Sequence, residues 1–485
     1  MSLHPRDPRR RPGAGGRPRP AQGAEAPGLE GPGRGRGGRP VNRRCRDRSR
    51  PAAAGPPAEA ETWAFDLLPG GLRVVLETIP YVRSVSVGVW VRAGSRHEPR
   101  ELGGVSHVLE HLLFKGTLRR SARRIAEDVD SIGGLLNGYT SKEYTCYYVK
   151  VLDIHLEKAL DLLSDLVLHP RLDPDDLAKE KRVILEEIKM CEDSPDELVG
   201  DLLAEAVWGD DGLGRPVIGS EEAVSAITPE EVRTYHAEQY RQKAVVVALA
   251  GNVEVEEGIR LVRRYFGPMP EGGRLSRGPG PTFTGGYRRR AKSIEQAHVC
   301  LGFRGVSMAD PAVYDFHLLA GVLGGGSSSR LFQAVREERG LAYSVYAYAC
   351  PFSDTGFLGL YAGVSPGNLL EVLSLMGREV RDIASGTVTP EELQRAKDQV
   401  KAAVLLGLEN TANRMSRLGR SLLLLDRIIS PDELARRVDA VTAESLAGVA
   451  RRVLDSDLTG LAVVGPEGLP PEHELRAAFA EGGGC

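Results

Sequence analysis

The chain has 485 residues, 41% of them hydrophobic, and a formal net charge of -3 at pH 7. This length exceeds what one hydrophobic core supports, so we expect two or more domains. The sequence contains no run of about 18 or more apolar residues, which argues against a membrane-spanning helix. Six cysteines without paired spacing argue against a disulfide framework and a thiolate metal site. These features favour a cytoplasmic protein without membrane contact, and the mitochondrial matrix is the alternative.

Residues 1–60 differ in composition from the rest of the chain. They hold 14 Arg and no Lys against 5 acidic residues, together with many Pro and Gly residues. Such a segment cannot bury enough apolar surface to fold, so we predict a disordered tail. The arginine-rich stretch at 34–38 could bind nucleic acid without sequence preference, but a passive extension is the favoured interpretation.

The first half of the remaining chain alternates strands and helices. Short alternating or apolar runs predict strands, and longer stretches with apolar residues at three- and four-residue intervals predict helices. On these criteria strands lie at 71–77, 84–91, 144–151 and 245–251, and helices lie at 101–115, near 125–132 and within 154–208.

The helix expected at 101–115 contains a His-x-x-Glu-His pattern formed by His107, Glu110 and His111. Side chains four residues apart lie on one face of a helix, so both imidazoles can bind one metal ion, with Glu110 beside it. The glutamate stands directly before the second histidine, which is the inverted form of a zinc-peptidase signature. Because short patterns also occur by chance, the helical context is what makes a zinc site the favoured interpretation.

Two histidines leave a zinc site short of the usual three protein ligands, so a third must come from elsewhere in the chain. In the helix expected at 173–193, Glu187 and Glu180 share a side that borders the apolar stripe. Glu186 lies on the solvated side. Acidic groups beside an apolar stripe are costly unless a cation or hydrogen bonds compensate them. We therefore predict Glu187 as the third ligand and Glu180 as its supporting carboxylate. Two ordinary surface carboxylates are the alternative.

The second half repeats the order of the first after a Gly- and Pro-rich stretch at 267–286. Strands are expected at 298–303, 343–349, 356–363 and 461–464, and helices at 314–323, 330–339 and 369–408. The repetition predicts an α+β fold of two homologous domains, each a largely antiparallel sheet covered by helices. The expected segments are a tail at 1–60, a zinc-bearing domain at 61–266, a linker at 267–290, a substrate-binding domain at 291–470 and a tail at 471–485.

Four motifs support a more specific interpretation. The histidine motif is followed by Leu-Asn-Gly-Tyr-Thr-Ser-Lys-Glu-Tyr-Thr at 136–145, by the acidic segment at 180–188, and by a glycine-rich segment at 324–332 that leads to Arg336 and Tyr343. In content and order these motifs resemble the insulinase and pitrilysin type of zinc endopeptidase, and most closely its bacterial branch similar to mitochondrial processing peptidase. The resemblance covers about residues 62–465.

The resemblance implies a processing-peptidase-like metallohydrolase fold and a role for each motif. Zinc would be held by His107, His111 and Glu187, with Glu110 as the catalytic base and Glu180 assisting it. The second half would contribute Arg336 and Tyr343 to hold the substrate, brought to the metal by closure of the two halves. One departure is Gly138, where relatives often have Ala, and it removes no functional group.

The residues Asn137, Gly138, Tyr139 and Thr140 are expected to bind substrate. Unpaired backbone in this stretch would accept an extended peptide as an added strand, an interpretation compatible with an ordinary hairpin turn at Asn137 and Gly138. The glycine-rich stretch at 324–326 lacks the Gly-Lys-Ser/Thr ending of a phosphate-binding loop, so a flexible loop near the substrate is expected instead.

These features predict a zinc metalloendopeptidase that cleaves unfolded peptides or flexible protein termini by way of a water molecule activated by Glu110. The alternative is a non-catalytic or partner subunit of a processing-peptidase-like complex. Because one chain carries both the metal motif and the Arg/Tyr pair, a self-sufficient monomer or a homodimer is favoured, with nucleic-acid binding by the tail unlikely.

Overall fold

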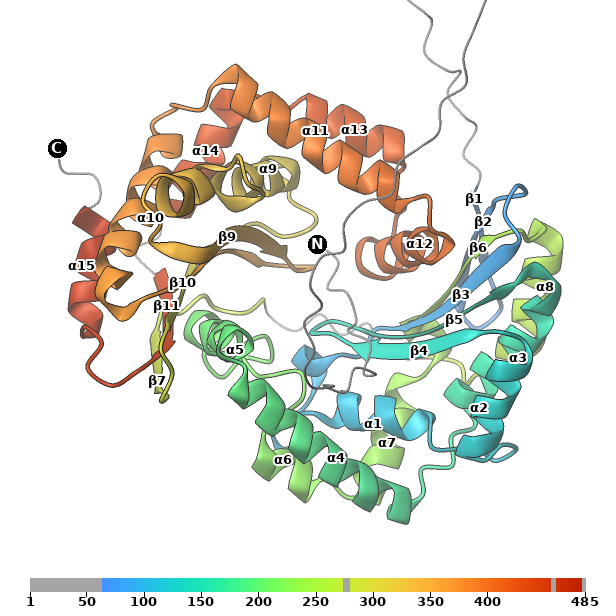
Figure 1. Ribbon diagram of the computed structural model, residues 1–485. Coiled ribbons are helices and arrows are strands. Elements are labelled where there is room, and N and C mark those ends of the chain that lie inside the picture. Colours follow the sequence, from blue (N-terminus) through green and yellow to red (C-terminus); the bar gives the residue numbers. More distant parts are fainter. Residues whose placement is uncertain (1–62, 274–279, 455–458, 482–485) are drawn as a thin grey trace, which may run out of the picture. The chain divides into compact units, whose positions relative to one another are not determined.

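A computed structural model describes residues 63–273, 280–454 and 459–481 (Figure 1). All of these residues fall within one compact unit, Glu59–Cys485. The tail expected at 1–60 lies outside the described residues. No helix among those described is both long and apolar enough to cross a membrane.

The first half is built on a six-stranded sheet with the strand order β1-β2-β6-β3-β5-β4. Its neighbouring strands run antiparallel except β2 and β6, which are parallel. The strands are β1 (Trp63–Leu67), β2 (Arg73–Thr78), β3 (Ser84–Val91), β4 (Leu135–Thr140), β5 (Thr145–Leu152) and β6 (Val245–Gly251). Four of them match the predicted strands closely, whereas β1 and β4 were not predicted as strands.

Except for the helix at Pro195–Trp208, the helices of the first half cover one face of this sheet, and their apolar side chains form a core with it. The helices of the first half are α1 (Val105–Leu113), α2 (Ala122–Ser131), α3 (Leu156–Leu168), α4 (Pro174–Asp193), α5 (Pro195–Trp208), α6 (Glu221–Ala226), α7 (Pro229–Gln239) and α8 (Val255–Phe266). Proline at the first position and an Asp173 side chain that accepts from the Asp175 N–H start α4 at the predicted residue.

The second half has a five-stranded sheet with the order β7-β11-β8-β10-β9, in which only β7 and β11 run parallel. Its strands are β7 (Tyr287–Ala291), β8 (Ala297–Arg304), β9 (Ala342–Pro351), β10 (Gly356–Val364) and β11 (Thr459–Gly465). Without β1, the first sheet follows the same sequence-to-space order and has its parallel pair in the same place. The prediction of two α+β domains of one topology is therefore confirmed.

The helices of the second half are α9 (Val313–Gly324), α10 (Leu369–Ala384), α11 (Pro390–Gly407), α12 (Thr411–Leu425), α13 (Pro431–Asp439), α14 (Ala443–Leu454) and α15 (Glu472–Glu481). A π-helical segment at Phe332–Glu337 replaces the regular helix expected at 330–339. The tail expected at 471–485 is wrong for 472–481, because Leu475 of α15 is buried and the Phe479 carbonyl accepts from Arg381 of α10. Similarly, β7 begins at Tyr287, inside the segment expected to be a linker.

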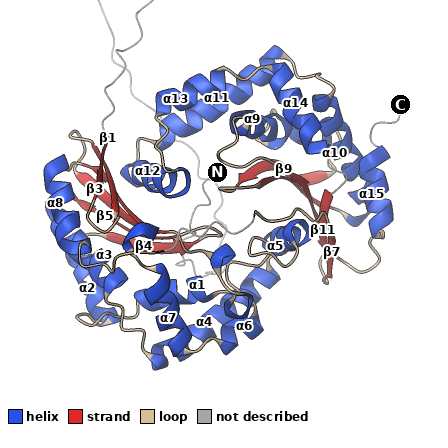
Figure 2. Cartoon of the chain, turned by 180° about the vertical axis from the view of Figure 1, so that it is seen from behind, coloured by secondary structure: helices blue, strands red, loops and turns tan. Residues whose placement is uncertain are grey.

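Each half lends one helix to the sheet of the other half (Figures 1 and 2). Helix α12 packs on the face of the first sheet that α1 and α3 leave open, where Met415 and Leu418 are fully buried with Trp90. Helix α5 packs in the same way on the second sheet. Two buried clusters thus contain side chains from both halves, so separating the halves would expose apolar surface on both sheets.

Ion pairs reinforce the attachment of α12. The Glu77 side chain on β2 is only 4% exposed and pairs with Arg414 and Arg417 of α12. A buried carboxylate requires such partners. If α12 left the first sheet, the Glu77 carboxylate would lose these two arginines and would have to be solvated by water instead.

We predict that Leu418→Ala lowers the free energy of unfolding by about 2–5 kcal/mol, because it leaves a cavity between α12 and the first sheet. Urea unfolding monitored by tryptophan fluorescence measures the change. The control is Leu406→Ala on α11, where the side chain is 66% exposed and we expect a change within about 0.5 kcal/mol. Equal effects of the two substitutions would contradict the buried position of α12.

Candidate metal centre

Helix α1 begins at Val105, four residues later than the periodicity predicts, because of its capping. Gly104 has a φ of +93°, a left-handed conformation that favours glycine, and a Cβ there would lie 2.7 Å from the Ile218 carbonyl oxygen. The buried Glu98 carboxylate accepts hydrogen bonds from the N–H groups of Gly104 and Ser106, at 2.7 and 2.8 Å. A carboxylate at a helix N-terminus satisfies free N–H groups, so Glu98 fixes where α1 starts and which way its histidines face.

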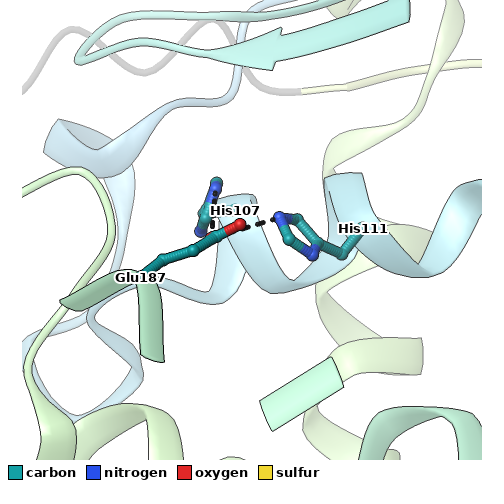
Figure 3. Close-up of side chains that lie close together, drawn as sticks. All are labelled: His107, His111 and Glu187. Atoms are coloured by element: carbon teal, nitrogen blue, oxygen red, sulfur yellow. Dashed lines mark ion pairs between the residues drawn. The ribbon is translucent and has the colours of Figure 1, made fainter. Parts of the chain in front are cut away.

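Three side chains from α1 and α4 converge on one point (Figure 3). Glu187 Oε2 lies 3.6 Å from His111 Nε2 and 3.9 Å from His107 Nε2. One donor atom from each residue lies within 4.8 Å of the other two. The structure thus brings together the three predicted ligands, while Glu186 points away and pairs with Lys189 in solvent.

The geometry of this cluster fits zinc. Ligand atoms at bond lengths of about 2.0–2.2 Å from a tetrahedral ion lie about 3.4 Å from one another, close to the observed separations. Burial, followed by the charge of His111, lowers the pKa of His107 to about 3, so its imidazole is neutral near pH 7, as metal binding requires. Among the described residues, His107 Nδ1 is buried without a hydrogen-bond partner.

Glu180 lies behind this cluster rather than in it. Its side chain is 6% exposed, with Oε2 3.1 Å from His111 Nδ1 and Oε1 2.8 Å from Lys115 Nζ. The position next to the ligands agrees with the expected supporting role, but both carboxylate oxygens already have basic partners.

The predicted base, Glu110, is held by the strand that follows the motif helix. The Thr140 hydroxyl at the end of β4 donates to Glu110 Oε2 at 2.6 Å. Burial raises the pKa of Glu110, and the hydrogen bond from Thr140 opposes that rise. Thr140, expected from the sequence only to bind substrate, therefore also orients the base.

The strand β4 is the outer strand of its sheet and pairs only with β5 among the described strands. Tyr139 is 37% exposed and packs edge-on against Trp90 and Tyr144. Asn137 Oδ1 accepts from the N–H of Gly138, so this side chain is occupied locally. A Cβ at Gly138 would lie 3.1 Å from the Tyr147 ring, which leaves little room for Ala without a shift of that ring.

A buried ionic cluster that was not predicted from the sequence lies at the turn between β4 and β5. Glu143 accepts from Arg96 at 2.7 Å and from the Ser353 N–H and hydroxyl at 3.0 and 2.6 Å. Arg96 also donates twice to Asp354, each at 2.9 Å. Since Ser353 and Asp354 belong to the second half, this cluster holds the β4 hairpin from both sides. Its only sequence signal is the place of Glu143 within the second motif.

Arg336 and Tyr343 contact each other but not the histidine cluster. The Arg336 guanidinium lies 4.8 Å from the centre of the Tyr343 ring and donates to the Tyr343 carbonyl at 3.0 Å. Tyr343 is 79% exposed. Among the described residues, neither makes a hydrogen bond or ion pair with the three clustered side chains. Helix α9 ends at Gly324, and residues 325–329 form bends and turns, so most of the glycine-rich segment lies outside regular secondary structure, as expected for a loop.

Comparison with known proteins agrees with this fold and cluster. A family model for insulinase, peptidase family M16, matches residues 73–221, and one for the peptidase M16 inactive domain matches residues 226–400. An uncharacterized zinc protease of Bacillus subtilis is 43% identical over 401 residues, which cover 83% of this chain and 98% of that protein. A second, from Mycobacterium leprae, is 43% identical over 408 residues, covering 82% and 91%.

Two solved structures share the fold at lower sequence identity. A protein from Pseudomonas fluorescens described as a peptidase M16 inactive domain has a TM-score of 0.78 and 21% identity, covering 84% of this chain and 99% of that one. A protease from Helicobacter pylori has a TM-score of 0.77 and 21% identity, covering 84% and 100%. The fold and the matches place the chain in a class of zinc proteases with a two-domain architecture. The chain belongs to the insulinase family, peptidase family M16, and zinc is its cofactor.

We predict that Glu187→Gln weakens zinc retention, because an amide replaces the anionic donor that faces both histidines. Glu186→Gln is the matched control on the same helix, since Glu186 is 71% exposed and pairs with Lys189. Metal analysis after dialysis against a chelator compares the two. Loss of zinc from Glu186→Gln with retention by Glu187→Gln would mean that the third ligand is misassigned.

Proposed function

We propose that the chain is a zinc metalloendopeptidase in which His107, His111 and Glu187 hold the metal and Glu110 is the catalytic base. The observation that carries the proposal is the convergence of two imidazoles and a carboxylate beside the half-buried side chain of Glu110, which accepts a hydrogen bond from Thr140. Membership of a family of zinc proteases supports the same activity.

The reaction requires one proton to be taken up and released. Zinc, when bound, supplies a Lewis acid that polarises the peptide carbonyl and lowers the pKa of bound water. Glu110 is placed one residue before a ligand and would accept the proton of the attacking water on a carboxylate oxygen. The protonated carboxyl of Glu110 would then pass the proton to the leaving amine.

We infer that substrates are unfolded peptides or flexible protein termini, bound in extended form. Among the described strands, none pairs with the outer edge of β4, which ends close to Glu110, and an added peptide strand would pair with this edge with little regard for the peptide sequence. A folded protein could not offer the same groups, because its own secondary structure already uses them.

Arg336 and Tyr343 fit a substrate-binding role in which they act on the centre of a second copy of the chain. Each half buries a helix against the sheet of the other, so a shift of one half relative to the other would disturb the packing of two apolar clusters. Tyr343 is largely exposed and free to contact a partner. We therefore favour a homodimer over a self-sufficient monomer.

The competing function is a non-catalytic or partner subunit of a processing-peptidase-like complex. Loss of a ligand or of the base would favour that function. This chain retains all three clustered donors and Glu110 with its threonine partner, which favours an enzyme.

We predict that Glu110→Gln keeps zinc but reduces cleavage of an unstructured peptide by at least about 100-fold, because the amide accepts no proton. Mass spectrometry of the peptide products measures cleavage, and metal analysis of the same sample measures zinc. Wild-type cleavage by the zinc-loaded variant would refute the assigned base.

We further predict that mixing two inactive variants, Glu110→Gln and Arg336→Ala, restores cleavage. A mixed dimer has one centre with an intact base and an intact arginine from its partner, so random pairing gives at most about a quarter of wild-type activity. Absence of recovery, with exchange of subunits demonstrated by mass, would show that Arg336 acts within its own chain. Full activity of Arg336→Ala alone would remove its substrate role.

A further inference from the structure

A chain of charged contacts leads away from the metal ligands. Glu180 Oε2 contacts His111 Nδ1 at 3.1 Å, and Glu180 Oε1 contacts Lys115 Nζ at 2.8 Å. His111 directs its other ring nitrogen toward Glu187, at 3.6 Å. Lys115, Glu180 and His111 therefore form one continuous line that ends at the proposed zinc position.

This line fixes the protonation of one ligand. An ionised carboxylate only accepts hydrogen bonds, so the bond to Glu180 requires the proton of His111 to be on Nδ1. The lone pair of Nε2 then faces Glu187 and the metal. A carboxylate behind a histidine ligand orients the ring and makes it a stronger donor.

The two histidine ligands differ in this respect. Among the described residues, His107 Nδ1 has no hydrogen-bond partner, whereas His111 Nδ1 has a buried carboxylate. Of the two histidines, His111 is therefore the one whose outer ring nitrogen is held by another side chain. Any change that moves Glu180 acts on the metal through this one ring.

We propose that Lys115 is a positioning residue for the metal centre, which acts through Glu180 on the ring of His111. The proposal rests on the proposed zinc site, because it assumes that His111 is a ligand. Lys115 follows the end of α1, and its ammonium group anchors the oxygen of Glu180 that does not face the histidine.

The contact between Lys115 and Glu180 differs from an ordinary surface ion pair because the Glu180 side chain is buried. Exposed pairs contribute little, because water competes for both partners. Glu180 is 6% exposed, so loss of Lys115 leaves one oxygen of a buried carboxylate without its cation. The pair of Glu186 and Lys189, at 2.7 Å on the same helix, is 71% and 58% exposed and contacts no histidine.

The test measures the zinc dissociation constant of the full chain by chelator competition. We expect Lys115→Met to weaken zinc binding about 10- to 100-fold, the usual effect of losing a group that supports a metal ligand. Lys115→Arg should restore binding to near the wild-type value, and Glu180→Gln should weaken it. Lys189→Met, the matched control, should bind zinc as the wild type does.

Cobalt spectra of the same variants provide a readout that depends on ligand geometry. At saturating Co²⁺, the visible absorption of Lys115→Met should differ from the wild type, and that of Lys115→Arg should not. Unchanged affinity and an unchanged spectrum for Lys115→Met would overturn the proposal, as would an equal loss of affinity in Lys115→Arg. If Glu187→Gln leaves zinc affinity unaltered, the zinc site itself is wrong, which is a separate failure.

Discussion

The candidate metal centre depends on the packing of two helices, α1 and α4, which together hold three donor atoms close to one point. His107 and His111 are one turn apart on α1, so their spacing follows from helix geometry alone. Glu187 reaches them only because α4 packs against α1 with a buried stripe that includes Leu177 and Ile184. The apolar core therefore sets the metal geometry, and an error of one residue in the phase of α4 would point Glu186 at the histidines instead.

Polar contacts around this point also hold the donor side chains and Glu110 in place. Glu98 fixes the first turn of α1, Glu180 holds His111 from behind, and Thr140 holds Glu110. Each contact engages a buried or partly buried charge that would be unstable without a partner. Similarly, Glu143 joins the β4 hairpin to the second half, so the strand that carries Thr140 is braced by both domains.

The sequence predicts elements well where periodicity and local chemistry agree. Helix α4 was predicted to within a residue, because its proline, its capping aspartate and its apolar stripe all give the same bounds. Periodicity placed the start of α1 too early, because the hydrogen bond from the Gly104 N–H to the Glu98 side chain, outside the apolar pattern, decides it. The outer strand β4 and helix α15 carry few large apolar residues in a clear pattern and are formed by pairing and packing with distant segments.

The predicted site divides in the same way. The three clustered donors and Glu110 could be predicted, because helix spacing brings the two histidines together and the apolar stripe of α4 places Glu187 on the side that borders the core. The partners Lys115 and Thr140 could not, since their contacts depend on side-chain positions across separate elements. No sequence pattern indicates that α5 packs on the sheet of the second half and α12 on that of the first. This packing matters for whether Arg336 acts at the centre of its own chain or of a second copy.

The most direct measurement is an anomalous difference map of the zinc-loaded protein, recorded at the zinc absorption edge. The account predicts one peak within about 2.0–2.2 Å of His107 Nε2, His111 Nε2 and a Glu187 oxygen, with Glu180 still on the far side of His111. A peak bound by other residues, or one that Glu187 does not reach, would contradict it.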